Sequence, residues 1–317
     1  MKTGLALSGG GDKGAFSVGV VKKLLEEGNS FDAVSGTSTG ALIAPLLCIP
    51  KGIDICEKFY RSVSVEDILM VDKVFLNVIK NQSIYSTLPL WNLIKKVFTQ
   101  EVFGSIMSSS TELFITTVSL TTGKLTYYTN KILQGTAKYN VVLLRDRAHL
   151  CRAILASCSQ PVLMPAINLD DQKHIDGGVK EYIPINILID RGVESAIAVV
   201  TSQKDISYYN SDISNIKDVL LETINILTSD VAENDLTMAE HINKGLLYIE
   251  VVRQSLIQLG IPEETVSTII DHNGNPFQGR KLFLLKVIRP ERNLGGGLTF
   301  SSAEMNEMFQ YGYNLST

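Results

Sequence analysis

The chain has 317 residues, of which 45% are hydrophobic and 20% are charged, and its formal net charge is −4. This length suits one large α/β domain, and no segment has a collagen-like, disordered or repetitive composition. The acidic balance and the lack of any run of Lys and Arg argue against a nucleic acid as partner.

No segment of the sequence predicts a membrane span or a cleavable export signal. The longest apolar run, residues 41–49, falls well short of the ~20 residues that a spanning helix needs, and it contains Pro45. The first residues lack the pattern of a secretory signal. We therefore expect a cytoplasmic protein whose membrane contact, if any, is peripheral; export without a cleavable signal stays open.

The cysteines match neither a disulfide framework nor a zinc pattern. We expect them to be buried free thiols, as is typical of a cytosolic protein. They are Cys48, Cys56, Cys151 and Cys158.

The first fifty residues alternate strands and helices. Residues 3–8 alternate and are followed by glycines, which predicts a strand before a turn, and residues 15–27 carry a helical apolar face. A short strand over 32–35 is followed by a helix over 39–48. This rhythm predicts an α/β fold with a mostly parallel central sheet flanked by helices.

The remaining elements continue that fold class. Hairpins are predicted at Thr121-Thr122-Gly123 and at Asp170-Asp171-Gln172, the second ending on Asp176. Helices are expected over 147–157 and from Pro184 to Asp190, and strands over 195–201 and 281–288.

Two segments, near 62–110 and 205–280, carry amphipathic helical patterns, including 213–226 and 246–259. We expect these segments to pack against the sheet in one domain that covers residues 1–317. The sharper alternative is a lid or a lipid-facing or substrate-binding surface, with Trp91, Phe98 and Phe103 as candidate contacts.

Gly36-Thr37-Ser38-Thr39-Gly40 is a G-x-S-x-G sequence between a predicted strand and a predicted helix. Glycines at both ends allow a tight turn that exposes the serine at its apex, which is the geometry of a nucleophile elbow. A serine hydroxyl attacks a carbonyl only when a base removes its proton. Ser38 is therefore the candidate nucleophile.

Gly9-Gly10-Gly11-Asp12-Lys13-Gly14 follows the first strand and satisfies G-x-G-x-x-G. A dinucleotide site also requires an acidic residue that closes the next strand, whereas Asp32 opens it. The spacing of a P-loop is absent as well. The remaining function is an oxyanion hole that uses the N–H groups of Gly10 and Gly11, with Lys13 holding the loop or adding positive potential.

A conventional triad would require a histidine, but the four histidines are better interpreted as structural or solvated. They are His149, His174, His241 and His272, of which only His174 lies close to Asp176 in the sequence. A carboxylate can instead deprotonate the serine directly. Asp176 would end a strand, and Gly177 and Gly178 would let its loop approach Ser38.

These motifs resemble those of the patatin-like phospholipases, acyl hydrolases with a Ser-Asp dyad. The family's oxyanion loop corresponds to Gly9–Gly14, its G-x-S-x-G to Gly36–Gly40 and its D-G-[A/G] to Asp176–Gly178. The block from Ala156 to Pro165 is similar to the sequence that precedes the family's aspartate. The resemblance is strongest over 3–50 and 150–200 and implies the family's three-layer architecture.

The resemblance implies a phospholipase A or lysophospholipase reaction. Ser38 would attack the ester of a phospholipid or lysophospholipid, Asp176 would accept its proton, and the Gly10 and Gly11 N–H groups would hold the oxyanion. It implies no metal or organic cofactor, and hence calcium independence.

Two other functions stay open at this point. One is an acyltransferase or thioesterase, although Thr37 stands where such enzymes place a histidine before the serine. The other is a signalling effector of the same fold that a nucleotide or a partner protein regulates. The lipid head group, the activator and the oligomeric state have no signature in the sequence.

Overall fold

A computed structural model describes residues 1–71, 83–204, 216–271, 274–295 and 300–315 of the chain. Its main sheet has nine strands within these residues, in the order β11-β10-β1-β2-β5-β6-β7, with β9 pairing to β5 and β8 to β9. The strands are β1 (Thr3–Leu7), β2 (Ala33–Thr37), β5 (Glu112–Ser119), β6 (Leu125–Thr129), β7 (Tyr139–Leu143), β8 (Ile167–Leu169), β9 (Gln172–Asp176), β10 (Ser195–Val199) and β11 (Leu284–Ile288). A separate small sheet pairs β3 (Met70–Val71) with β4 (Tyr85–Ser86).

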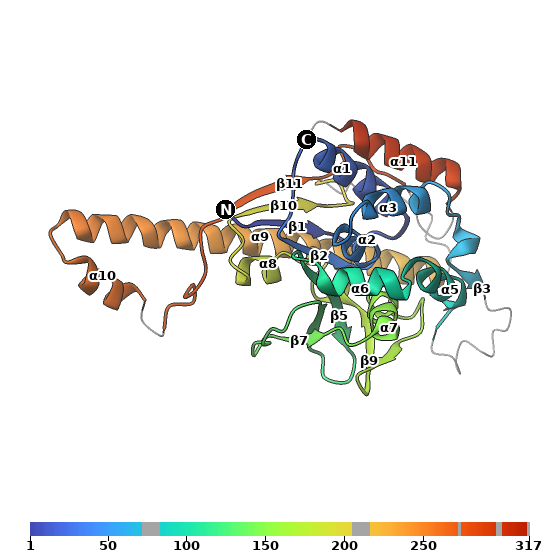
Figure 1. The fold of residues 1–317 in the computed structure, drawn as a ribbon, viewed down its shortest axis with the longest axis horizontal. Helices are drawn as coiled ribbons and strands as arrows, with labels where there is room; N and C mark the ends of the chain where they lie inside the picture. The colour runs from blue at the N-terminus through green and yellow to red at the C-terminus, as the bar shows by residue number, and fades with distance from the viewer. Residues whose placement is uncertain (72–82, 205–215, 272–273, 296–299, 316–317) are drawn as a thin grey trace.

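The five strands from β11 to β5 run parallel, whereas β6 and β9 run antiparallel to β5. The helices of the described residues are α1 (Gly14–Glu26), α2 (Thr39–Leu47), α3 (Gly52–Tyr60), α5 (Leu88–Val97), α6 (Gln100–Ser108), α7 (Arg147–Ser157), α8 (Asn186–Asp190), α9 (Ile216–Gln258), α10 (Glu263–Ile270) and α11 (Ser302–Asn314). This mostly parallel sheet between helices confirms the predicted fold class (Figure 1).

Side chains that alternate along β1 divide the core into two layers. Leu5 and Leu7 pack with α1, α2, α7 and α11 on one face, whereas Ala6 packs with α8 and α9 on the other. Alternation is the expected behaviour of a strand, because successive side chains point to opposite faces. The result is three layers, helix on sheet on helix, with each face of the sheet covered.

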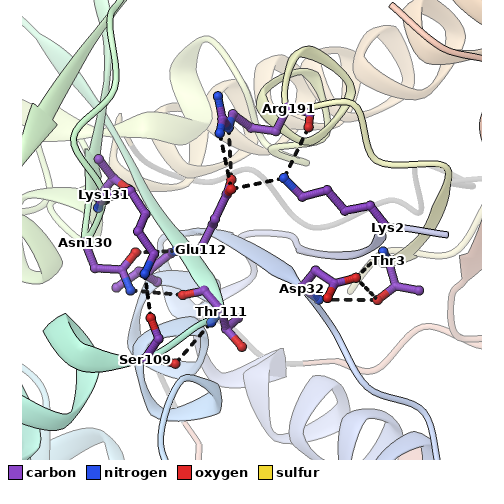
Figure 2. Close-up of polar contacts among 11 residues, drawn as sticks. Lys2, Thr3, Asp32, Ser109, Thr111, Glu112, Asn130, Lys131 and Arg191 are labelled. Atoms are coloured by element: carbon purple, nitrogen blue, oxygen red, sulfur yellow. Dashed lines mark hydrogen bonds and ion pairs between the residues drawn. The ribbon is translucent and has the colours of Figure 1, made fainter.

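Polar contacts hold the sheet together where its parallel strands begin (Figure 2). Glu112, the first residue of β5, accepts hydrogen bonds from Lys2 at 3.0 Å and from Arg191 at 2.9 Å. Burial would raise the pKa of Glu112, but the Arg191 and Lys2 charges outweigh it and lower that pKa. Asp32 likewise accepts from the Thr3 backbone N–H at 2.7 Å. These contacts join three strands at the edge of the sheet where β2 begins, away from Ser38, which follows its other end.

Helix α9 differs from the prediction. Helices over 213–226 and 246–259 were expected, but Ile216–Gln258 forms one helix of 43 residues, and 213–215 lie outside the described residues. Ala232, Leu236 and Ala239 make an apolar stripe between the two predicted segments, so the stretch that links them is itself amphipathic. The C-terminal part of α9 projects beyond the body of the protein, with α10 folded beneath it (Figure 1).

Two proposed lipid contacts are wrong. Phe98 and Phe103 are 1% and 8% exposed and belong to the core between α5, α6 and α7, because the helical pattern cannot tell a core face from a lipid-facing one. Trp91 is half-buried beside Lys95, whose ammonium lies 5.3 Å from the indole ring centroid. The predicted helix at Pro184 begins later, at Asn186. The four cysteines are buried free thiols, as expected.

Candidate functional site

Ser38 is the single residue between β2 and α2, and its backbone has φ 56° and ψ −119°. A side chain at positive φ is strained, and such strain is typical of a nucleophile elbow. The glycines on either side permit it. A Cβ at Gly36 would collide with the Gly40 carbonyl, and one at Gly40 would collide with the Leu7 carbonyl. The predicted strand–turn–helix geometry is therefore present.

The pairing of β5 brings Asp176 next to Ser38. Strand β2 pairs with the first part of β5 and ends with Thr37 opposite Thr116. Strand β9 pairs with the second part of the same edge and ends with Asp176 opposite Thr117. The two strands approach each other from opposite directions along one edge of β5. Residues 138 positions apart in the sequence thus become neighbours at the point where both strands end.

The carboxyl of Asp176 lies in a dry environment, since this residue is 7% exposed. Its Oδ1 accepts a hydrogen bond from the Gly178 N–H at 2.7 Å. Burial raises the pKa of Asp176 to about 6, although the Gly178 N–H and the Ser38 hydroxyl both oppose the rise by hydrogen bonding. A carboxylate with this pKa is a stronger base than a surface aspartate and is still ionised at neutral pH.

The backbone of Ser38 is held on both sides by the end of α7. Its N–H donates to Ser157 Oγ at 2.9 Å, and that hydroxyl donates onward to the Thr116 carbonyl at 2.6 Å. The Cys158 thiol donates to the Ser38 carbonyl at 3.3 Å. The N–H of Ser38 is therefore already engaged and is not free to bind an oxyanion.

The glycine loop lies beside β10 and the segment that follows Gly178. The Gly9 N–H donates to the Tyr182 carbonyl at 3.1 Å, and the Gly9 carbonyl accepts from Thr201 Oγ1 at 2.6 Å. Gly10 has φ 149°, and a Cβ there would collide with the Thr201 side chain. Only glycine fits this position, since both the conformation and the space exclude a side chain.

The N–H groups of this loop divide into two sets. Those of Lys13 and Gly14 donate back to the Gly10 and Gly11 carbonyls, and that of Gly9 is taken by Tyr182. Those of Gly10 and Gly11 have no acceptor within the described ranges. These two consecutive N–H groups follow the end of β1, and N–H groups without a protein acceptor are the kind that can bind an anion.

Two of the four histidines have structural partners. His174 Nδ1 lies 3.0 Å from Thr117 Oγ1, and burial lowers the pKa of its imidazole. His149 Nε2 lies 3.2 Å from Asp170, at the predicted second hairpin. His241 is exposed on α9, and His272 lies outside the described residues. No imidazole is hydrogen-bonded to Ser38 or Asp176 in the described part of the chain.

Several residues that support the site were not identified as site residues from the sequence, among them Tyr182, Thr201, Asp235 and, beyond its place in the similar block, Ser157. They form hydrogen bonds to Ser38, to the glycine loop or to the segment that follows Gly178, and no local sequence motif identifies them.

No group of three His, Cys, Asp or Glu side chains within the described residues is suited to hold a metal ion. Nor does any helix of the described part combine the length and apolarity needed to cross a membrane.

Comparison with known proteins places these motifs in one family. The sequence profile described as "Patatin-like phospholipase" matches residues 5–189. The chain is 28% identical over 260 residues to neuropathy target esterase sws of Drosophila melanogaster, covering 79% of this chain and 16% of that protein. It is 26% identical over 217 residues to an Escherichia coli cUMP-AMP-activated phospholipase, covering 65% of this chain and 62% of the relative.

The chain thus spans less than two thirds of the length of these relatives. Among solved structures, the chain is similar to VipD from Legionella pneumophila, with a TM-score of 0.45 and 12% identity over 99% of this chain and 65% of that one.

Proposed function

Because the chain belongs to the patatin-like phospholipase family, we propose that it hydrolyses the carboxylic esters of phospholipids or lysophospholipids, with Ser38 as nucleophile and Asp176 as base. The family and its esterase and lipase relatives support a lipid hydrolase. The observation that carries the proposal is the meeting of β2 and β9 on one edge of β5. It brings a strained serine and a buried carboxylate together, and no histidine of the described residues is hydrogen-bonded to either.

The reaction proceeds in two halves. Ser38 Oγ bonds to the ester carbonyl carbon while its proton passes to Asp176, and the oxyanion accepts hydrogen bonds from the Gly10 and Gly11 N–H groups. The C–O bond to the lipid alcohol breaks, and Asp176 returns the proton to that leaving group. Water then attacks the acyl-enzyme while Asp176 accepts its proton. The bond between the acyl carbon and Ser38 Oγ breaks, Asp176 returns the proton to Ser38, and the free fatty acid leaves.

The remaining residues of the three motifs have supporting roles in this proposal. Lys13 and Gly14 brace the glycine loop through their N–H groups, and Gly9 is braced by Tyr182. Thr37 ties the end of β2 to the Glu181 carbonyl at 3.0 Å. Gly177 lets the Asp176 loop pass close to the Thr116 carbonyl, where a Cβ would lie at 2.6 Å. Thr39 and Gly40 begin the helix that follows the nucleophile.

A surface hollow of about 320 Å³ is the candidate approach for the lipid. It is lined by Ser86 and Thr87, by Leu88 and Trp91 of α5, by Arg152 and Leu155 of α7, and by Pro165. Mostly apolar walls with two hydroxyl side chains and one guanidinium suit an acyl chain beside a phosphate. Trp91 is the chain's one tryptophan, so its emission reports on this hollow directly. We expect a blue shift on adding anionic phospholipid vesicles; unchanged emission under conditions where hydrolysis proceeds would exclude this approach.

Turnover tests the proposed chemistry. Purified wild-type protein should release fatty acid from lysophosphatidylcholine and p-nitrophenol from a short-chain ester. Ser38→Ala and Asp176→Asn should each lower kcat by about 100-fold or more. Asp171→Asn, the same change on an exposed turn, is the matched control and should keep wild-type activity. Full activity in Asp176→Asn would refute the dyad, and acyl transfer to an acceptor without release of fatty acid would favour the acyltransferase.

Regulation of the same activity is a second candidate, supported by the similarity to a phospholipase whose name includes a cyclic dinucleotide activator. Assays with and without cUMP-AMP test it. A rise in kcat that depends on Ser38 would support this regulation. Equal rates with and without cUMP-AMP would show that this nucleotide is not the activator.

A further inference from the structure

One irregular segment of the chain touches all three sequence motifs. Residues 181–184 follow the Asp176 loop and precede α8. The Glu181 N–H donates to the Gly177 carbonyl at 2.9 Å, the Tyr182 carbonyl accepts from Gly9, and the Glu181 carbonyl accepts from Thr37. The 181–184 segment is therefore bonded to the base loop, to the glycine loop and to the strand that carries Ser38.

A carboxyl group of α9 fixes this segment. Asp235 Oδ2 on α9 accepts hydrogen bonds from the N–H groups of both Tyr182 and Ile183, each at 2.8 Å. The segment is not part of a helix or strand, so these two buried N–H groups have no ladder to join and need a side-chain acceptor. Asp235 Oδ2 alone accepts both hydrogen bonds.

Asp235 occupies a costly position. It is 6% exposed and lies within the apolar stripe of Ala232, Leu236 and Ala239. Burial raises the pKa of the Asp235 carboxyl, and the neighbouring charge of Glu181 raises it further. A carboxyl in such a place destabilises the fold unless its hydrogen bonds compensate. Its two bonds to the 181–184 segment are the compensation that the structure provides.

We propose that Asp235 is a positioning residue for the Ser38–Asp176 site, which acts by fixing the 181–184 segment and through it the glycine loop and the end of β2. This inference rests on the proposed function. Helix α9 runs from this contact to the projecting part of the molecule (Figure 1). Asp235 thereby links the catalytic site to a helix that lies outside the three motifs.

Three variants test the inference. Asp235→Ala removes the acceptor, Asp235→Asn keeps a carbonyl oxygen at the same place, and Asp230→Ala removes an exposed carboxylate from the same helix as the matched control. Each is measured for kcat and KM on a soluble ester, for the rate of Ser38 labelling by a fluorophosphonate, and for hydrogen exchange in peptides that cover 177–184 and 8–14.

We expect Asp235→Ala to lose exchange protection in both peptides and to show a kcat about 10- to 100-fold lower, with a smaller change in KM, because misplaced catalytic groups slow the chemical step. Asp235→Asn should remain within about threefold of wild type, since an amide oxygen accepts the same two bonds. Asp230→Ala should match wild type. If Asp235→Ala does not fold, Asp235→Ser replaces it, since that side chain is too short to reach both N–H groups.

The outcomes distinguish a failure of this inference from a failure of the proposed function. An active wild-type protein with an equally active, equally protected Asp235→Ala or Asp235→Ser overturns the inference alone. A decline in stability with unchanged kcat and unchanged labelling rate also overturns it, because the role would then be structural only. A folded wild type that shows neither hydrolysis nor Ser38 labelling overturns the proposed function, and with it the catalytic role of Asp235.

Discussion

Asp176→Asn should make the protein more stable at alkaline pH while removing its base. Burial raises the pKa of Asp176 from 3.8 to about 6. An ionised carboxylate at this place therefore costs ~3 kcal/mol at pH 8, since a rise of about two units is worth ~1.4 kcal/mol each. Asparagine never ionises and can keep the hydrogen bond from Gly178, so it avoids this cost.

The direction of this pH dependence of stability follows from proton binding by Asp176. The folded state holds the Asp176 proton more tightly than the unfolded state, so wild-type stability decreases as the pH rises from about 4 to 6 and stays lower above that range. The gain of Asp176→Asn over wild type should reach up to ~3 kcal/mol at pH 8 and about half of that at pH 5.

Urea denaturation followed by circular dichroism, at pH 5 and pH 8, measures this gain. Subtracting wild type from variant cancels the titration of every other group. Asp171→Asn on the exposed turn should give no comparable gain. Two results would refute this prediction: an Asp176→Asn variant no more stable than wild type at pH 8, or a difference in unfolding free energy that does not grow with pH.

Three further results are expected. The kcat/KM of the wild type should fall about tenfold per pH unit below about 6 and be level above it, since Asp176 must be ionised to accept a proton; a profile without this limb would exclude it as the base. Gly40→Ala should cost about 3 kcal/mol or more, because its Cβ would collide with a carbonyl of β1, whereas Gly104→Ala in α6, with open space around it, should gain up to ~1 kcal/mol; thermal melts that rank them otherwise would contradict the packing. Glu112→Gln should lose about 1–3 kcal/mol at pH 7 and less as the pH falls through the lowered pKa of Glu112, with kcat unchanged; equal stability at pH 7 would show that the ion pairs contribute nothing.

The local part of the site could be predicted because its geometry is encoded in glycines. Gly36 and Gly40 are required by close backbone approach on either side of Ser38, and Gly10 by a backbone conformation that other residues avoid. Each requirement concerns a few consecutive residues. The strand–turn–helix arrangement and the alternation of elements therefore follow from the order of residue types.

The parts of the site and of the fold that could not be predicted depend on tertiary contacts. Nothing near Asp235 in the sequence marks it, because its role comes from two N–H groups more than fifty positions away. Helix α9 joins the core through its middle part, with side chains such as Ala232 and Leu236, which lie outside both predicted helices. Phe98 and Phe103 belong to amphipathic helices whose apolar faces meet the core and not a lipid, a choice that periodicity leaves undetermined.

Covalent labelling tests the central claim most directly. A fluorophosphonate transfers its phosphonyl group to an activated serine with loss of fluoride, and peptide mass spectrometry locates the adduct. We expect a single adduct on Ser38 in the wild type, a much slower reaction in Asp176→Asn, and none in Ser38→Ala. A folded wild type that reacts at another serine, or not at all, would contradict the assignment of Ser38 as the nucleophile.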